Sequence, residues 1–259
     1  MDVLYIGMDG TQIPMVRSEL EGRAGPVAGN PARTREVKPG CVFMQTGIDE
    51  NGRPVRDEAS TTYTGAIETA EEFGRRIYTE AWERGWSRAK KKALLGDGAA
   101  WIWNNAGQHF PGAVQIVDIY HARQHLWELA RALHPNQERK QKRRILRQQA
   151  RLDQGRIENL VRSLLNTETN NPQLANKIHL EAEYFERNTE RMRYPSFRRQ
   201  HLFIGSGVIE AACKTVIGNR LKRSGMFRTV RGANAIIALP CNRLSHQFED
   251  YWSSRSPAA

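Results

Sequence analysis

Short apolar runs, each bounded by glycine or other turn-forming residues, dominate the first half of the chain. Runs of this length and spacing are typical of β-strands rather than helices. Asn51-Gly52 adds a tight turn between the second and the third run. Residues 17–36 carry Gly, Pro and Arg without a period and predict a mobile basic loop. The predicted strands cover residues 3–8, 41–44, 55–63, 92–97 and 113–118.

Helical spacing of apolar residues appears between the third and the fourth predicted strand. Residues 66–86 place Phe73, Ile77 and Ala81 on one side and predict a helix, and residues 99–106 predict a shorter one. Three antiparallel strands, a helix, and then strand, helix and strand is the element order of a ribonuclease-H-like fold. The pattern therefore predicts an α/β protein with a ribonuclease-H-like mixed sheet.

The second half of the chain is helical and highly charged from His121 to about Gln200. Gly205-Ser206-Gly207 ends this segment, and Ser206 can cap a further helix. We expect residues 122–200 to be a helical insertion that is looped out of the core. The predicted layout is a first core part at 1–121, the insertion at 122–200, closing core helices at 201–252 and a disordered tail at 253–259.

The net charge of +11 favours a polyanionic partner, and 39% hydrophobic residues suffice for a folded core. No apolar run approaches the roughly 20 residues of a membrane-spanning helix, and the N-terminus lacks a signal-peptide pattern. Cys41, Cys213 and Cys241 are far apart and predict neither a zinc ribbon nor disulfides, so we expect a cytoplasmic setting. The basic run at 138–147 is either a solvated helix face or a DNA contact.

Two aspartates stand at the ends of predicted strands and precede glycine: Asp9 and Asp97. If the first and the fourth strand are neighbours, these carboxylates meet, and a shared cation would offset their repulsion. Two Mg²⁺ (or Mn²⁺) ions suit such oxygen ligands and can support displacement at phosphorus. Glu210, near the start of the Ser206 helix, is the candidate third ligand. In the alternative interpretation, each Asp-Gly is an ordinary turn and Glu210 forms a surface ion pair with Lys214.

Several stretches resemble the ISKra-type insertion-sequence transposases of bacteria, in the same order along the chain. They are Gly7-Met8-Asp9-Gly10-Thr11, the residues 95–103, 110–113 and 118–122, Gly205-Ser206-Gly207-Val208-Ile209-Glu210, and the residues 230–235 and 248–252. The resemblance implies a ribonuclease-H-like core that binds divalent metal through two aspartates and one glutamate. In this sequence these are Asp9, Asp97 and Glu210.

The resemblance also implies an Asp-x-x-His strand end, which corresponds to Asp118 and His121. These two residues would orient a ligand or touch DNA, or His121 simply packs at a helix start. His125 lies four residues after His121, but no acidic residue of the metalloprotease pattern stands between them, so zinc is not predicted. Basic residues that follow Glu210 would neutralise DNA phosphates or only add solubility. They are Lys214, Arg220, Lys222, Arg223 and Arg231.

The expected activity is metal-dependent nicking and strand transfer of an insertion element, with element ends and target DNA as partners and a homo-oligomer on DNA. Two departures from the family pattern suggest an N-terminally truncated or inactive copy. Met1 lies only a few residues before Asp9, and Arg228 and Pro240 replace a usual Trp and Arg. The alternatives are an inactive DNA-binding remnant and a ribonuclease-H-like nuclease that only hydrolyses. We expect a bacterial, nucleoid-associated protein.

Overall fold

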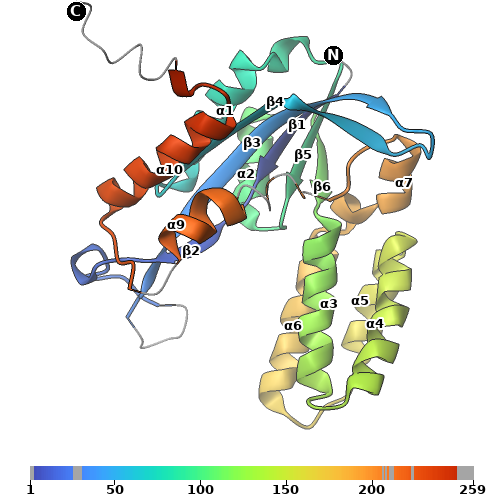
Figure 1. Ribbon diagram of the computed structural model, residues 1–259. Helices are drawn as coiled ribbons and strands as arrows, with labels where there is room; N and C mark the ends of the chain where they lie inside the picture. Colours follow the sequence, from blue (N-terminus) through green and yellow to red (C-terminus); the bar gives the residue numbers. More distant parts are fainter. Residues whose placement is uncertain are drawn as a thin grey trace, which may run out of the picture.

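A computed structural model describes residues 3–25, 31–205, 207, 209, 213–222 and 225–249, with the backbone alone at 213–215 and 219. Its centre is a six-stranded mixed sheet (Figure 1). The predicted mixed α/β class is therefore confirmed. The strands are β1 (Val3–Met8), β2 (Thr11–Pro14), β3 (Thr34–Ile48), β4 (Pro54–Ala66), β5 (Lys91–Gly96) and β6 (Val114–Val117).

The strand order is β2-β3-β1-β5-β6, and β4 pairs with β3. β3 runs antiparallel to β1, β2 and β4, whereas β5 is parallel to β1 and β6 is parallel to β5. β1 lies between two strands, and all six of its residues are buried. The predicted loop at 17–36 is wrong at both ends, because a short 3-10 helix η1 (Arg17–Glu19) begins it and β3 already starts at Thr34.

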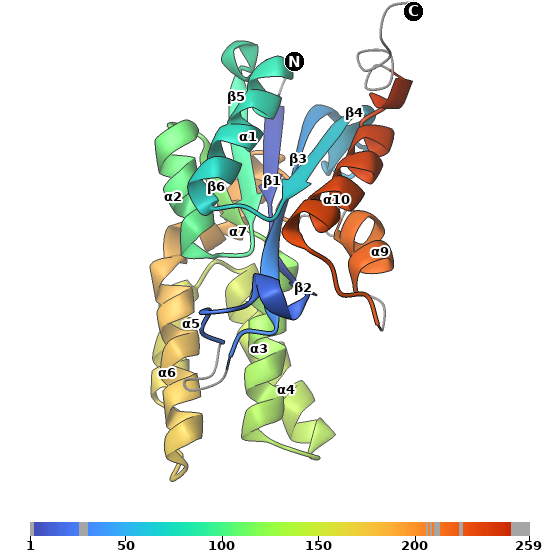
Figure 2. The same cartoon turned by 90° about the vertical axis from the view of Figure 1, so that its left-hand side faces the viewer.

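Helices cover both faces of the sheet. The α helices are α1 (Ala70–Glu83), α2 (Ala100–His109), α3 (Ile119–Leu133), α4 (Glu138–Asp153), α5 (Ile157–Leu165), α6 (Pro172–Arg187), α7 (Tyr194–Arg199), α9 (Asn219–Leu221) and α10 (Val230–Leu244). Short turns of other helix types are η2 (Trp86–Arg88), η3 (Thr189–Met192) and the π-helix η4 (Cys213–Gly218). In Figure 2, α1 and α2 lie on one face of the sheet, and α9 and α10 lie on the other. No described helix is both long and apolar enough to cross a bilayer.

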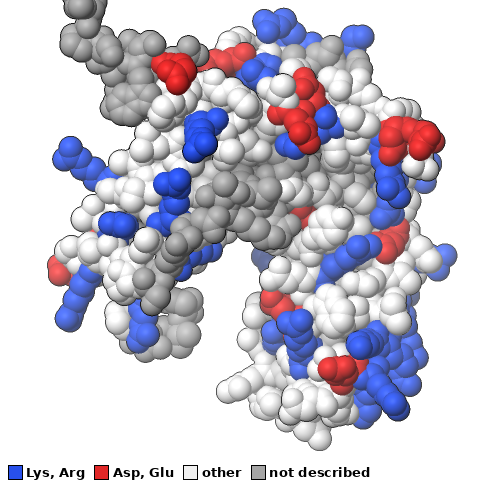
Figure 3. All heavy atoms as spheres, in the orientation of Figure 1, with Lys and Arg blue, Asp and Glu red and all other residues white. Residues whose placement is uncertain are grey.

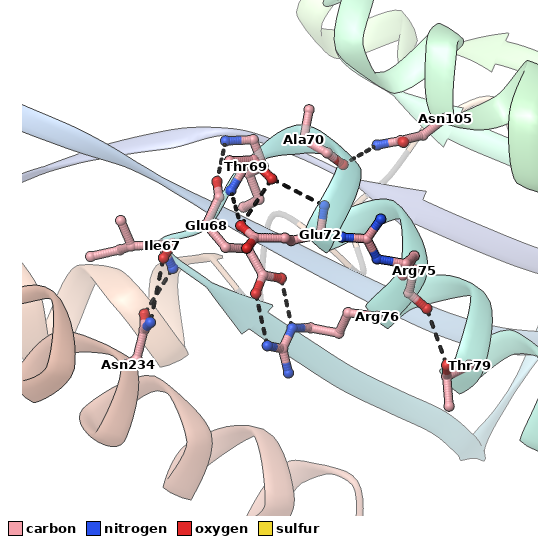
Figure 4. A network of polar contacts seen from close by, with 11 residues as sticks. Ile67, Glu68, Thr69, Ala70, Glu72, Arg75, Arg76, Thr79, Asn105 and Asn234 are labelled. Carbon is pink, nitrogen blue, oxygen red and sulfur yellow. Dashed lines mark hydrogen bonds and ion pairs between the residues drawn. The ribbon is translucent and has the colours of Figure 1, made fainter.

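The corner between β4 and α1 joins the layers through polar contacts (Figure 4). Thr69 and Glu72 form a reciprocal capping box at the start of α1, as a Thr-x-x-Glu sequence predicts. Asn234 of α10 accepts a hydrogen bond from the Ile67 N–H at 2.8 Å. Since a side chain of α10 pairs the backbone N–H of the buried Ile67 at this corner, the last helix is held against the end of β4.

Helices α3 to α6 extend beyond the carboxyl-terminal edge of β1, β5 and β6 (Figure 1). Apolar residues of this helical segment nevertheless belong to the same buried cluster as the sheet, among them Phe185 of α6 and Tyr194 and Phe197 of α7. The buried Tyr194 hydroxyl donates a 3.0 Å hydrogen bond to the Val117 carbonyl at the end of β6. At its base this segment therefore shares one buried core with the sheet, and its status as an insertion stays a prediction.

Candidate active site at the carboxyl edge of the sheet

Three aspartates follow the ends of three adjacent parallel strands. Gly7 of β1 pairs with Leu95 of β5, and two further residues along each strand lead to Asp9 and Asp97. Gly96 of β5 pairs with Val117 of β6, so Asp97 and Asp118 are likewise neighbours. Adjacent strands lie about 5 Å apart. The topology therefore brings together Asp9 and Asp97, which are 88 positions apart in the sequence (97 − 9).

The turns after β1 and β5 hold the first two carboxylates. The Gly10 N–H donates to Asp9 Oδ1 at 2.7 Å, and the Ala99 N–H donates to Asp97 Oδ1 at 2.8 Å. Burial raises the pKa of Asp97; the Ala99 N–H opposes this, and the negative charge of Asp9 adds to it. A carboxylate that is half-buried beside another acid is stabilised by a cation. This edge thus has the electrostatics of a cation site.

Asp118 has a different setting from the other two aspartates. It is buried, and its Oδ1 accepts hydrogen bonds from the N–H groups of Tyr120 and His121 at 2.6 and 3.3 Å, which caps α3. This cap fixes the start of α3 beside the site. His121 lies close enough for its imidazole to lower the pKa of Asp97, against the dominant effect of burial. The structure thus brings Asp118 and His121 to the same edge as Asp97.

Glu36 and Lys38 of β3 also border this edge, and neither was predicted from the sequence. The charge of Glu36 contributes to the raised pKa of Asp97, after burial and Asp9. Glu36 Oε2 lies 2.8 Å from Lys38 Nζ, and the Lys38 side chain is 9% exposed. The alternation of Glu36, Val37 and Lys38 could have predicted a strand. Pro39 and Gly40 directly after it obscured that pattern, because both residues are uncommon inside strands.

Tyr184 of α6 connects the helical segment to the Asp97 turn. Its hydroxyl donates a 2.8 Å hydrogen bond to the Asp97 carbonyl. Its ring covers Gly98, which has φ +102° and where an added Cβ would lie 2.5 Å from the ring. The same ring stacks on His125 at 3.9 Å, and His125 Nδ1 lies 2.7 Å from Glu181 Oε2. Helices α3 and α6 therefore restrain the turn that carries Asp97.

The predicted third carboxylate, Glu210, lies outside the described residues, as do Arg223 and the side chain of Lys214. The predicted tail at 253–259 lies outside them too. Ile209 is described and buried, and a Cβ added at Gly7 of β1 would lie 3.4 Å from its Cδ1. Within the described part of the chain, no three His, Cys, Asp or Glu side chains form a metal-binding group.

The other predicted DNA-binding residues lie on α9 and α10 or next to them. Lys222 is exposed and donates a hydrogen bond to Thr11 Oγ1, two residues after Asp9. Arg220 and Arg231 are exposed as well. Arg228, at a position where the insertion-sequence pattern has Trp, has a buried Nε with no hydrogen-bond partner among the described residues. Pro240 lies inside α10.

A cavity of about 1080 Å³ opens beside the start of α3. Its walls combine aromatic rings and guanidinium groups, among them Tyr120, Phe203, Arg53 and Arg56. Tyr120 is 59% exposed although its neighbours Ile119 and Asp118 are buried. The cavity thus presents stacking and cationic groups next to the aspartate edge.

Comparison with known proteins identifies no family for this chain. No family model matches it, and no curated protein matches it. Among solved structures, the Drosophila P element transposase strand transfer complex is similar, with 8% identity over 97% of this chain and a TM-score of 0.29. The match spans 66% of that chain, slightly less than two thirds. At this identity and TM-score, the likeness establishes neither the fold nor the function of this chain. The resemblance to ISKra-type transposases therefore has no support from the comparisons.

Proposed function

We propose that this protein is the catalytic part of a DNA transposase that transfers phosphoryl groups with the help of divalent metal. The observation that carries the proposal is the pairing of Asp9 and Asp97 at the ends of adjacent parallel strands, with the pKa of Asp97 raised by burial and by Asp9. A carboxyl group with a raised pKa at the carboxyl-terminal edge of a sheet is characteristic of functional sites.

A ribonuclease-H-like core is the fold that we propose for residues 1–121. The strand order β4-β3-β1-β5-β6, with only β3 antiparallel to the central β1, supports it. Helix α1 connects β4 to β5, and α2 connects β5 to β6. This is the element order that the sequence pattern predicts for that fold.

The residues at this edge fit a divalent metal such as Mg²⁺ or Mn²⁺. Asp9 and Asp97 offer the oxygen ligands that these ions prefer. Burial, and then the charge of Asp9, raises the pKa of Asp97, and a bound cation would offset both effects. Two such ions, when bound, would stabilise the attacking and the leaving oxygen of a phosphodiester. Asp9 and Asp97 would hold them, while Asp118 and Tyr184 keep the surrounding backbone in place.

Glu210 is the third carboxylate of the proposed site. The contact between its neighbour Ile209 and Gly7, two residues before Asp9, supports this choice. Glu36 is less suitable because Lys38 already offsets its charge at 2.8 Å. Lys222 beside Thr11, together with Lys214, Arg220, Arg223 and Arg231, would bind DNA phosphates near the site.

A nicking assay tests the proposal. The purified chain is incubated with supercoiled plasmid in Mg²⁺, Mn²⁺ or EDTA, and relaxed circles are quantified. We expect metal-dependent nicking by the wild type and by Glu71→Gln, an exposed carboxylate on α1 that serves as the control. Asp9→Asn, Asp97→Asn and Glu210→Gln should each lower the nicking rate on the order of 100- to 1,000-fold. Undiminished nicking by Asp97→Asn would refute the assignment.

An inactive DNA-binding remnant is the second candidate. Two features favour it: Arg228 Nε is buried without a hydrogen-bond partner among the described residues, and Pro240 lies inside α10. Both are unfavourable in a folded protein. Such a remnant would bind DNA but not nick it in any metal. A nuclease that only hydrolyses would nick without joining strands, and a strand-transfer assay with pre-cut element ends separates it from a transposase.

A further inference from the structure

Helices α4 and α5 form an open groove in which every charged lining residue is an arginine. These residues are separate in the sequence from those of the aspartate edge. The volume of the groove is about 620 Å³. Arg144 and Arg151 are seven residues apart on α4 and so lie on one side of it, two turns from each other. We call Arg144, Arg151, Arg156 and Arg162 the arginine groove. The neutral residues that line it are Asn159, Ser163, Asn166 and Thr167.

A smaller adjoining hollow of about 170 Å³ shares Arg144 and Arg151 and extends the same surface. Lys140, Arg143 and Arg147 line this second hollow. Figure 3 shows blue Lys and Arg atoms gathered at the lower right, where Figure 1 places α4. Four basic residues of the run noted in the sequence therefore line one surface: Lys140, Arg143, Arg144 and Arg147.

No carboxylate neutralises the arginine groove within the described part of the chain. Neither hollow is lined by Asp or Glu, and none of the four arginines forms an ion pair among the described residues. The nearest acids on these helices face elsewhere. Asp153 pairs with Arg123 at 2.8 Å, and Glu158 pairs with Arg193.

Uncharged hydrogen bonds hold two of the guanidinium groups in position. Arg144 Nη2 donates to Thr167 Oγ1 at 2.7 Å, and Arg151 Nη1 donates to Gln148 Oε1 at 3.0 Å. Gln148 is buried and its Nε2 donates to Ser163 Oγ at 3.1 Å, which ties α4 to α5. The cations are thus pre-oriented while their charge stays available to an external anion. Pre-orientation of this kind reduces the entropic cost of binding.

Positive charges are close together here, and they add to burial in lowering the pKa of Arg144 and of His134. Burial, followed by the charge of Arg151, lowers the pKa of Arg144. Burial also lowers the pKa of His134, followed by Arg144, Lys140 and Arg143. Like charges that are held together disfavour one another, and an anionic ligand would supply the counter-charge.

We propose that the arginine groove binds the phosphodiester backbone of duplex DNA, at a second contact surface separate from Lys222 and the aspartate edge. The proposal takes its partner from the proposed function but requires neither the metal nor Glu210. Arg144 and Arg151 are about 10 Å apart along α4, and further basic residues continue along the helix, which suits a row of phosphates better than one small anion. Guanidinium groups also match phosphate oxygens in geometry.

The test measures DNA binding in EDTA, so that it is independent of cleavage. A fluorescent 25-base-pair duplex of arbitrary sequence is titrated with the full chain from 50 to 300 mM NaCl, with anisotropy as the readout. We expect Arg156→Gln/Arg162→Gln to weaken DNA binding about tenfold at 150 mM NaCl. The slope of the logarithm of the binding constant against the logarithm of the NaCl concentration should decrease in magnitude by about 2. When Arg144→Gln/Arg151→Gln is added, the total decrease in the magnitude of this slope should be about 3–4.

The matched control is Arg88→Gln/Lys90→Gln, which removes the same charge from exposed positions at the amino end of β5. It should leave the salt slope near that of the wild type, and circular dichroism melts verify that all variants fold. Equal slopes for the groove and control variants would overturn the proposal. Competition by inorganic phosphate beyond that of NaCl at equal ionic strength would instead show a small-anion site. Loss of binding to phosphatidylserine vesicles, with DNA binding intact, would show a lipid surface.

The outcome is distinguishable from a failure of the proposed function. If nicking is absent in every metal while the groove variants still lose salt-dependent DNA binding, the groove proposal stands and the catalytic proposal falls. If nicking depends on Asp97 while the groove variants bind DNA as the control does, the catalytic proposal stands and the groove proposal falls.

Discussion

The aspartate edge and the arginine groove both gather like charges, yet they differ in how the fold holds them. At the edge, strand register and two tight turns set the positions of Asp9 and Asp97, and burial raises the pKa of Asp97. In the groove, positions along two helices and a few neutral hydrogen bonds hold exposed or half-exposed arginines. The aspartate edge depends on defined backbone geometry, which a catalytic site requires. The arginine groove depends mainly on how many positive charges it presents, which is sufficient for binding a polyanion.

The largest effect should separate the two regions by activity. Asp97→Asn should lower the nicking rate on the order of 100- to 1,000-fold at any DNA concentration, because it removes a group that acts in the transition state. The deficit of Arg156→Gln/Arg162→Gln should instead shrink as DNA concentration rises, since it reflects affinity. Initial rates over a DNA concentration series check this. A deficit in Asp97→Asn that saturating DNA removes would contradict the distinction.

A glycine substitution should show how strongly the aspartate edge depends on backbone geometry. Gly98→Ala should lower the free energy of unfolding by about 2 kcal/mol or more, because φ is +102° and the new Cβ would meet the Tyr184 ring at 2.5 Å. Gly107→Ala in α2 is the control, since an added Cβ there has no neighbour within 4 Å. It should stabilise by about 0.5–1 kcal/mol. Urea denaturation measures both, and equal effects would contradict the packing of Tyr184 on Gly98.

Removing the buried charge should stabilise the metal-free protein. The folded-state pKa of Asp97 is above its unfolded value, so the protonated carboxyl favours folding and this contribution is lost as pH rises through the folded pKa. The asparagine side chain of Asp97→Asn does not ionise, so the variant does not lose this stability and should melt a few degrees higher than the wild type at pH 7 in EDTA. For a protein of this size, 1 kcal/mol corresponds to about 2–4 °C in melting temperature. The difference in melting temperature between the variant and the wild type should decrease towards pH 4, because the wild-type carboxyl is then protonated. Millimolar Mg²⁺ should raise the melting temperature of the wild type and not that of the variant.

The smallest effect concerns His134 at the rim of the groove. Its pKa is lowered by burial and then by Arg144, Lys140 and Arg143, so Arg144→Gln should raise it and added DNA should raise it in the wild type. Histidine NMR titration measures both changes. Arg88→Gln should leave the titration as it is in the wild type. A pKa of His134 that DNA does not alter would argue against phosphate binding in the groove.

Much of the sheet was predictable from its apolar runs, because a buried strand must be apolar at nearly every position. The runs at 3–8 and 92–97 correspond to β1 and β5, although β3 proved much longer than residues 41–44. β2 and the first half of β3 were missed, since Pro14, Pro39 and Gly40 interrupt them. Backbone pairing with neighbouring strands outweighs such local preferences, and a single sequence does not display it.

What the sequence determined by itself was the residue chemistry: aspartates placed directly after apolar runs, a basic balance of charge, and an arginine-rich helix with helical spacing. What only the tertiary structure decided was adjacency. The parallel pairing of β1 with β5 puts Asp9 beside Asp97, the packing of α6 brings Tyr184 over Gly98, and the packing of α4 on α5 joins four arginines into one groove. The physical reason is that local periodicity fixes which face a residue occupies, whereas long-range burial and strand register fix which faces meet.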